Sequence, residues 1–196
     1  MALFKMRDMG ELGHFLGYWV TRNRAKRTIS ITQDAYVKKL IDCAGLSDAN
    51  PTTLPLPAGT QLERYTGSPV DFPYARHIGG ILYATLATWP DAAYANQHLS
   101  QFSSNPGPKH IAGLKSLFRY LWGTLDYGLT YNGLETSAQP VGYSDADWAQ
   151  NILDWKSISG VVFTLAGAAI CWISKKQPTV ALSSMEGEYM ALSLAV

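Results

Sequence analysis

Three carboxylates near the end of the chain stand where they could bind a metal or act as acid and base. Asp145 and Asp147 follow the apolar run Val141–Ser144. If this run is a strand that continues through them, both side chains leave the same face, because side chains alternate along a strand. A carboxylate at the end of a core strand is well placed to hold a divalent cation. Ser-Asp-Ala-Asp also suits a turn, so the local sequence leaves both structures open.

Glu188 is the third of these carboxylates, and it falls in a segment that predicts a helix from residue 184 onward. Ser183 and Glu186 form a capping-box pattern, which gives Glu186 a local role. Glu188 has no such role, and its neighbours on the helix are apolar or small: Ala191, Leu192 and Ala195. We therefore expect Glu188 on the buried side, where a carboxylate needs a metal or a hydrogen-bonding partner.

Basic residues gather at the other end of the chain. Residues 1–50 carry more Lys and Arg than Asp and Glu, whereas residues 139–196 carry more acids than bases. A basic cluster can grip phosphates without reading bases, although solvated surface is the alternative interpretation. The candidate nucleic-acid-binding residues are Arg22, Arg24, Lys26, Arg27, Lys175 and Lys176, with Lys38 and Lys39 in support.

Composition limits the classes of protein to which the chain can belong. It has 196 residues, of which 47% are hydrophobic, enough for one large domain or two small ones. The net charge of +1 argues against a protein that coats polyanions generally. No apolar run reaches the about 18 residues that a membrane-spanning helix needs. Cys43 and Cys171 cannot form a zinc site alone, which favours a reducing, intracellular setting.

The elements that position these residues fall into three blocks. Residues 15–21 and 28–32 predict two strands joined by a hairpin connection at 24–27, and a helix follows with Thr32 as its N-cap. Residues 51–73 hold half of the prolines and predict an extended linker. Residues 74–125 predict three helices with apolar stripes. Residues 126–196 predict strands at 129–131, 141–144, 161–164 and 169–173 before the last helix. The expected fold class is α+β.

Several long motifs in collinear order resemble the Pol polyprotein of copia-type LTR retrotransposons. Residues 142–149, 156–160 and 174–192 are similar to the start of that family's ribonuclease H domain. Residues 9–17 resemble the end of its reverse transcriptase palm, and residues 83–91 and 117–124 resemble the helical connection between the two enzymes. The resemblance thus covers nearly the whole chain.

The resemblance implies four parts. Residues 1–50 would be a C-terminal remnant of the reverse transcriptase palm and thumb, and residues 51–73 a proline-rich linker. Residues 74–125 would be the helical connection. Residues 126–196 would be a truncated ribonuclease H-like domain, with an incomplete mixed sheet and a helix at the C-terminus.

The resemblance also implies a chemistry. Ribonuclease H places four carboxylates around two Mg²⁺ ions to cut the RNA strand of an RNA–DNA hybrid. The family's first two carboxylates correspond to Asp145 and Glu188, whereas Asp147 belongs to the motif without an assigned metal. The other two carboxylates and the polymerase aspartates have no counterpart in this sequence. The chain alone is therefore expected to be inactive or nearly so, with weak Mg²⁺ binding.

The expected partners are RNA–DNA hybrid or other nucleic acid and the remainder of the Pol polyprotein, with no membrane. The expected location is intracellular: the cytoplasm, a virus-like particle or the nucleus. Two rival functions stay open. One is a non-enzymatic scaffold or nucleic-acid-binding remnant of a decayed element. The other is an unrelated hydrolase, such as a glycosidase, with Asp145 and Glu188 as acid and base.

Overall fold

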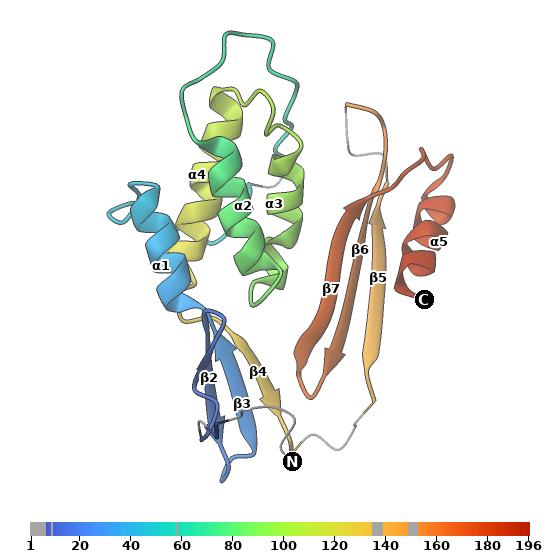
Figure 1. Cartoon of the computed structure of the whole chain (residues 1–196). Helices are drawn as coiled ribbons and strands as arrows, with labels where there is room; N and C mark the ends of the chain where they lie inside the picture. The colour runs from blue at the N-terminus through green and yellow to red at the C-terminus, as the bar shows by residue number, and fades with distance from the viewer. Residues whose placement is uncertain (1–6, 9, 58, 135–138, 149–152) are drawn as a thin grey trace, which may run out of the picture.

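The chain forms an α+β structure with three parts: a front sheet, a helical unit, and a rear sheet covered by one helix (Figure 1). The computed structural model describes residues 7–8, 10–57, 59–134, 139–148 and 153–196. The expected α+β class is confirmed. None of the helices in these ranges is long and apolar enough to cross a membrane.

The front sheet is antiparallel, with strand order β1-β2-β3-β4. Its strands are β1 (His14–Phe15), β2 (Tyr18–Asn23), β3 (Thr28–Thr32) and β4 (Leu129–Asn132). Residues 24–27 connect β2 and β3 as predicted, and Arg27 completes the turn in the left-handed region at φ 52°. β4 was expected in the rear block, but it pairs with β3 through Ile31 and Leu129. Such long-range pairing leaves no mark in the local pattern.

The helical unit contains α1 (Asp34–Cys43), α2 (Tyr74–Thr85), the 3₁₀ turn η1 (Pro90–Ala92), α3 (Ala93–Ser100) and α4 (Pro108–Gly123). Their apolar stripes meet in the main core, whose largest fully buried side chains include Trp89, Tyr74, Phe118 and Ile81. The predicted cap at Thr32 is wrong, because Thr32 still pairs with Trp19 in the sheet. Gln33 precedes α1 instead, and its buried side chain accepts a hydrogen bond from Thr88.

The connection between α1 and α2 has no helix or strand among its described residues, as the prolines predicted. Residues 59–66 of this connection are here called the strap. Leu62 is buried in the main core, and the backbone carbonyl of Glu63 lies 2.9 Å from Nε2 of His110. The Asn105 amide donates to the carbonyl of Tyr65 at 2.9 Å. These contacts fasten the strap to the helical unit at the turn between α3 and α4.

The rear sheet contains β5 (Val141–Asp147), β6 (Ile158–Leu165) and β7 (Ala168–Lys176) in that order. All its described strands pair antiparallel, so the expected mixed sheet is wrong for this part of the chain. Helix α5 (Ser184–Ala195) packs on one face, where a Cβ at Gly187 would lie 3.6 Å from that of Ala146. Ser183 caps α5 as predicted, accepting a bond from the Glu186 backbone N–H at 3.2 Å.

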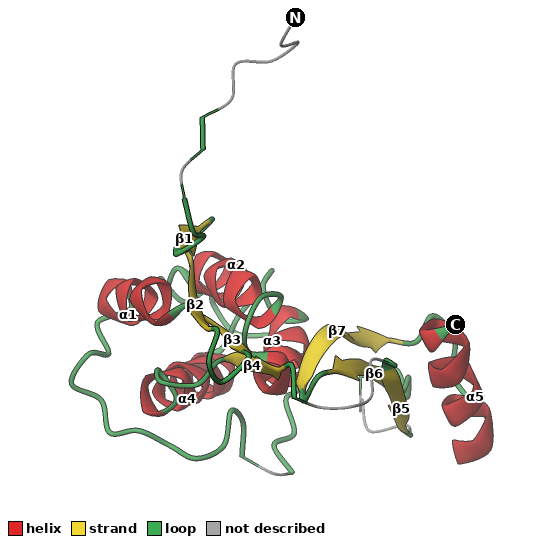
Figure 2. Cartoon of the chain, turned by 90° about the horizontal axis from the view of Figure 1, so that it is seen from below, coloured by secondary structure: helices red, strands yellow, loops and turns green. Residues whose placement is uncertain are grey.

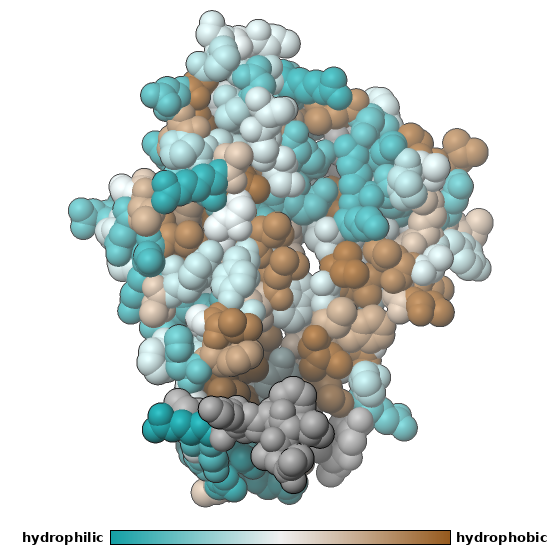
Figure 3. All heavy atoms as spheres, in the orientation of Figure 1, coloured by the Kyte–Doolittle hydropathy of each residue, from teal (hydrophilic) through white to brown (hydrophobic). Residues whose placement is uncertain are grey.

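The rear sheet docks on the rest of the molecule through β7 and its hairpin with β6 (Figure 2). Trp172 donates from its indole to the carbonyl of Thr85 at 2.6 Å. The backbone N–H of Asn132 in β4 donates to the carbonyl of Ala166 at 2.8 Å. Apolar side chains gather along the junction of the three parts (Figure 3). They line a groove of about 470 Å³.

Candidate carboxylate pocket and nucleic-acid interface

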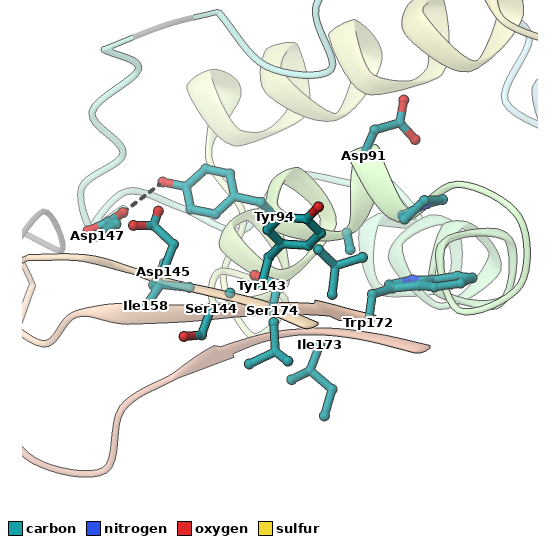
Figure 4. Close-up of a pocket in the computed structure, with 15 residues that line it drawn as sticks. Asp91, Tyr94, Tyr143, Ser144, Asp145, Asp147, Ile158, Trp172, Ile173 and Ser174 are labelled. Atoms are coloured by element: carbon teal, nitrogen blue, oxygen red, sulfur yellow. Dashed lines mark hydrogen bonds between the residues drawn. The ribbon is translucent and has the colours of Figure 1, made fainter. Parts of the chain in front are cut away.

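Asp145 and Asp147 lie on one face of the rear sheet, because β5 continues through both of them. Asp145 pairs with Gly160 and Asp147 with Ile158, so the strand interpretation holds and the turn does not. Both residues line a pocket of about 460 Å³ between the sheet and the segment η1–α3. Figure 4 shows the two carboxylates on the side of the sheet that faces Tyr94.

The helical unit closes the opposite side of this carboxylate pocket. The Tyr94 hydroxyl donates to Oδ2 of Asp147 at 3.5 Å, a long hydrogen bond. Partial burial, and then the nearby Asp147 carboxylate, raise the pKa of Tyr94 above its ordinary value. Asp91 also lines the pocket, and its carboxylate accepts a hydrogen bond from the Tyr120 hydroxyl. The pocket therefore combines three carboxylates with the aromatic rings of Tyr94, Tyr143 and Trp172.

Glu188 stands apart from this pocket. It is exposed and does not line the pocket that contains Asp145. Gly187 and Ala191 are the buried residues of α5, and the next position along a helix is turned by about 100° from its neighbour. The expectation that Glu188 lies on the buried side is therefore wrong. Helix α5 covers the Ala146 face of β5, whereas the side chain of Asp145 leaves the opposite face.

The two-magnesium centre implied by the family does not fit the residues that the structure describes. Mg²⁺ is held by several oxygen ligands in near-octahedral geometry. No group of three or more His, Cys, Asp or Glu residues among the described ranges is arranged to hold a metal ion. Asp145 and Asp147 share a face, but Glu188 does not join them. A two-metal centre on this sheet would need Glu188 or other carboxylates beside Asp145, and the described residues do not place them there.

The basic residues predicted in the front block gather on the hairpin Tyr18–Thr32, here called the basic hairpin. Arg22, Arg24, Lys26 and Arg27 are all exposed there, and the hairpin contains no Asp or Glu. Glu11 is an acidic neighbour, with its carboxylate 2.6 Å from the Arg24 guanidinium. The hydrogen bond and the charge of Arg24 lower the pKa of Glu11. The structure thus brings four of the six predicted phosphate-binding residues to one place.

Lys175 and Lys176 end β7 and point to opposite faces, so they do not form one cationic site. The Lys176 ammonium lies 2.7 Å from the Asp154 carboxylate and donates to the Gln101 amide at 3.0 Å. Burial raises the pKa of Asp154, but hydrogen bonds from Lys176 and the Lys156 backbone outweigh it and leave that pKa low. Lys176 therefore has a structural role, whereas Lys175 is exposed beside α5.

Sequence reasoning did not find Tyr94 or Asp91 as parts of the carboxylate pocket. Both belong to the helical unit, and they meet β5 only through the docking of two parts that are more than 50 residues apart. Nothing in the helical pattern around residue 94 distinguishes that tyrosine from an ordinary half-exposed aromatic residue.

Comparison with known proteins finds no matching family model and no matching solved structure. Among curated proteins, the Pol polyprotein of transposon TNT 1-94 from Nicotiana tabacum is 35% identical over 96% of this chain. The Pol polyprotein of transposon RE1 from Arabidopsis thaliana is 34% identical over 97% of it. The chain belongs to the copia-type retrotransposon Pol family. It spans 15% and 13% of the length of these two polyproteins.

Shorter relatives match this Pol segment along most of their own length. An uncharacterized mitochondrial protein of Arabidopsis thaliana, AtMg00810, is 31% identical over 98% of the chain and 79% of its own length. Secreted RxLR effector protein 161 of Plasmopara viticola is 51% identical over 63% of the chain and 86% of its own length. The segment therefore recurs both within long Pol polyproteins and as the larger part of short proteins.

Proposed function

We propose that this Pol segment binds RNA–DNA hybrid through the phosphate backbone, with the basic hairpin as its main contact. The observation that carries this proposal is the local charge. Four exposed cations and no acid occupy Tyr18–Thr32, in a chain whose total formal charge is only +1. A cluster of this kind attracts a polyanion at short range and carries no base-reading geometry. We therefore expect hybrid binding without sequence preference.

The test is fluorescence anisotropy with a labelled hybrid at several salt concentrations. Replacing Arg22, Lys26 and Arg27 by Ala removes three positive charges, each of which can pair with one phosphate. The slope of log K against log salt then falls by about one for each phosphate that the variant no longer neutralises. The matched control removes the same charge elsewhere, through Arg76, Lys109 and Lys115, which are exposed and lie outside the hairpin. Equal weakening in the two triple variants, or binding that does not weaken as salt rises, would refute the proposal.

We infer further that β5–β7 and α5 are the beginning of a ribonuclease H-like unit, and that the chain alone binds hybrid without cutting it. The motifs at 142–149 and 174–192 and the family membership support this assignment. Asp145 and Glu188, the two carboxylates that the resemblance assigns to the metal centre, do not line one pocket, which supports inactivity of the chain alone. Incubation of labelled hybrid with Mg²⁺ tests the inference. Cleavage by the chain that disappears in Asp145→Asn would show that a working centre exists.

A non-enzymatic scaffold is the second candidate, because this segment makes up 79% of the length of AtMg00810. A scaffold predicts no hybrid binding at low salt and no change of thermal stability with Mg²⁺. A glycosidase needs its acid and base on either side of one cleft. Glu188 does not line the pocket of Asp145, so the geometry does not favour that reaction.

A further inference from the structure

A second polar pocket lies where the strap, the turn between α3 and α4, and the end of β7 meet. Its volume is about 470 Å³, and the residues that matter for its chemistry are Arg64, Ser104, Asn105, Asp154 and Lys176. In Figure 1 the connection that includes the strap crosses the end of the helical unit opposite the front sheet. The strap pocket is therefore separate from both the basic hairpin and the carboxylate pocket.

Arg64 is the residue of the strap pocket that is best placed to bind an anion. Its two chain neighbours are both fastened, Glu63 through its carbonyl to His110 and Tyr65 through its carbonyl to Asn105. The ring of Tyr65 also packs against the backbone of Gly107, leaving no room for a Cβ there. The backbone of Arg64 is thus held on both sides, while its side chain is exposed. An arginine presented this way loses less conformational freedom when it binds a ligand.

The charges around the strap pocket do not balance. Lys176 is already paired with Asp154 at 2.7 Å. No carboxylate in the described part of the chain forms an ion pair with Arg64. The pocket therefore presents two cations against one anion, with the Ser104 hydroxyl as a neutral hydrogen-bonding group beside them. A guanidinium presents a planar set of donors that matches two oxygens of one phosphate.

The geometry points to the strap pocket as a second phosphate site, in which Arg64 binds a backbone phosphate of the nucleic acid. The inference rests on the proposed hybrid binding and deepens it. It adds a contact supplied by the linker, at the end of the molecule away from the basic hairpin. The positive charge of Arg64, which no carboxylate in the pocket neutralises, matches the single negative charge of one phosphodiester. Lys176 stays bonded to Asp154, and its charge also attracts the phosphate.

The experiment compares Arg64→Ala with Arg76→Ala in the full chain, using the same labelled hybrid. Both arginines are exposed, and Arg76 lies on α2 and does not line the strap pocket. Arg64→Ala is expected to weaken hybrid binding about tenfold and to lower the salt slope by about one. Arg76→Ala is expected to leave both unchanged. Arg64→Lys keeps the charge but not the planar fork, so it should recover part of the affinity. Thermal unfolding of each variant verifies the fold.

Two further titrations, with inorganic phosphate and with AMP, distinguish a backbone phosphate from a free one. Saturable AMP binding that Arg64→Ala abolishes, with hybrid binding unchanged, would overturn the assignment to the nucleic-acid backbone. Equal hybrid affinity in Arg64→Ala and the parent chain would overturn it as well. If the hairpin variant loses affinity while Arg64→Ala does not, the strap site fails and the proposed function stands. If Arg64→Ala loses affinity while the hairpin variant does not, the strap site stands and the basic hairpin is not the main contact.

Discussion

Acidification below about pH 6.5 should destabilise this chain, because three of its histidines are buried and have lowered pKa values. The clearest is His110, only 2% exposed. Its Nδ1 accepts the backbone N–H of Gly107 at 2.8 Å, so its Nε2 carries the proton and donates to the carbonyl of Glu63. Protonation would place a second N–H against that of Gly107 and break the bond. Burial lowers the pKa of His110, outweighing the bond to Glu63.

His77 and His98 act in the same direction. Burial, and then the charge of Arg76, lower the pKa of His77. Burial, followed by Lys176 and His110, lowers the pKa of His98, whose ring nitrogens have no hydrogen-bond partner among the described residues. In the unfolded chain all three titrate near pH 6.5. Between that pH and their lowered folded values, the unfolded state binds more protons, so stability falls as pH falls.

The magnitude follows from proton linkage. Each histidine contributes a slope of at most about 1.4 kcal/mol per pH unit. Three histidines therefore give at most about 4 kcal/mol per unit, a limit approached about one unit below pH 6.5, where the unfolded histidines are mostly protonated. This is a large part of the roughly 5–15 kcal/mol that holds a domain folded. Urea unfolding followed by tryptophan fluorescence at pH 7.5, 6.5 and 5.5 measures it. His110→Asn should unfold more easily at pH 7.5. Its unfolding free energy should depend on pH less steeply, by at most the about 1.4 kcal/mol per pH unit that one histidine contributes. An unchanged slope in the variant, or greater stability of the parent chain at pH 5.5, would refute the reasoning.

Three substitutions test the packing by thermal or urea unfolding. Ser183→Ala removes the cap of α5 and should cost about 1 kcal/mol, whereas Ser183→Asp, which can still cap, should not. Leu114→Ala leaves a cavity in the fully buried core of the helical unit and should cost about 3 kcal/mol, whereas a cost below about 1 kcal/mol would mean that this core is loosely packed. Gly128→Ala would bring a Cβ to 2.6 Å from the carbonyl oxygen of Ile31, so it should weaken the β3–β4 pairing, while Gly133→Ala, with its nearest atom at 3.1 Å, should cost less.

Local features of the fold were predictable where neighbouring residues determine them. The basic hairpin follows from two β-prone runs around a polar turn, and the cap at Ser183 follows from a pattern four residues long. The three helices of residues 74–125 follow from apolar spacing and from the breakers between them. For the same reason, Asp145 and Asp147 could be placed on one face once β5 was a strand.

Features that depend on distant pairing could not be predicted in this way. β4 pairs with the edge of β3 that β2 leaves free, a partner almost a hundred residues earlier in the chain. The side chosen for Glu188 failed because the small residues Gly187 and Ala191, rather than the larger apolar ones, face the sheet. Small residues let a helix approach a sheet closely, and that preference outweighs an apolar stripe read from one helix alone.

The insertion of β4 beside β3 has a practical consequence for dissecting this polypeptide. A fragment that stops before Leu129 would leave this edge of β3 without the strand that Leu129–Asn132 provides. Uncovered strand edges recruit other chains, so such a fragment should self-associate, even though every residue of the hairpin is retained. A fragment boundary that keeps this edge of β3 covered therefore lies beyond Asn132, a hundred residues after Thr32, where the strand ends.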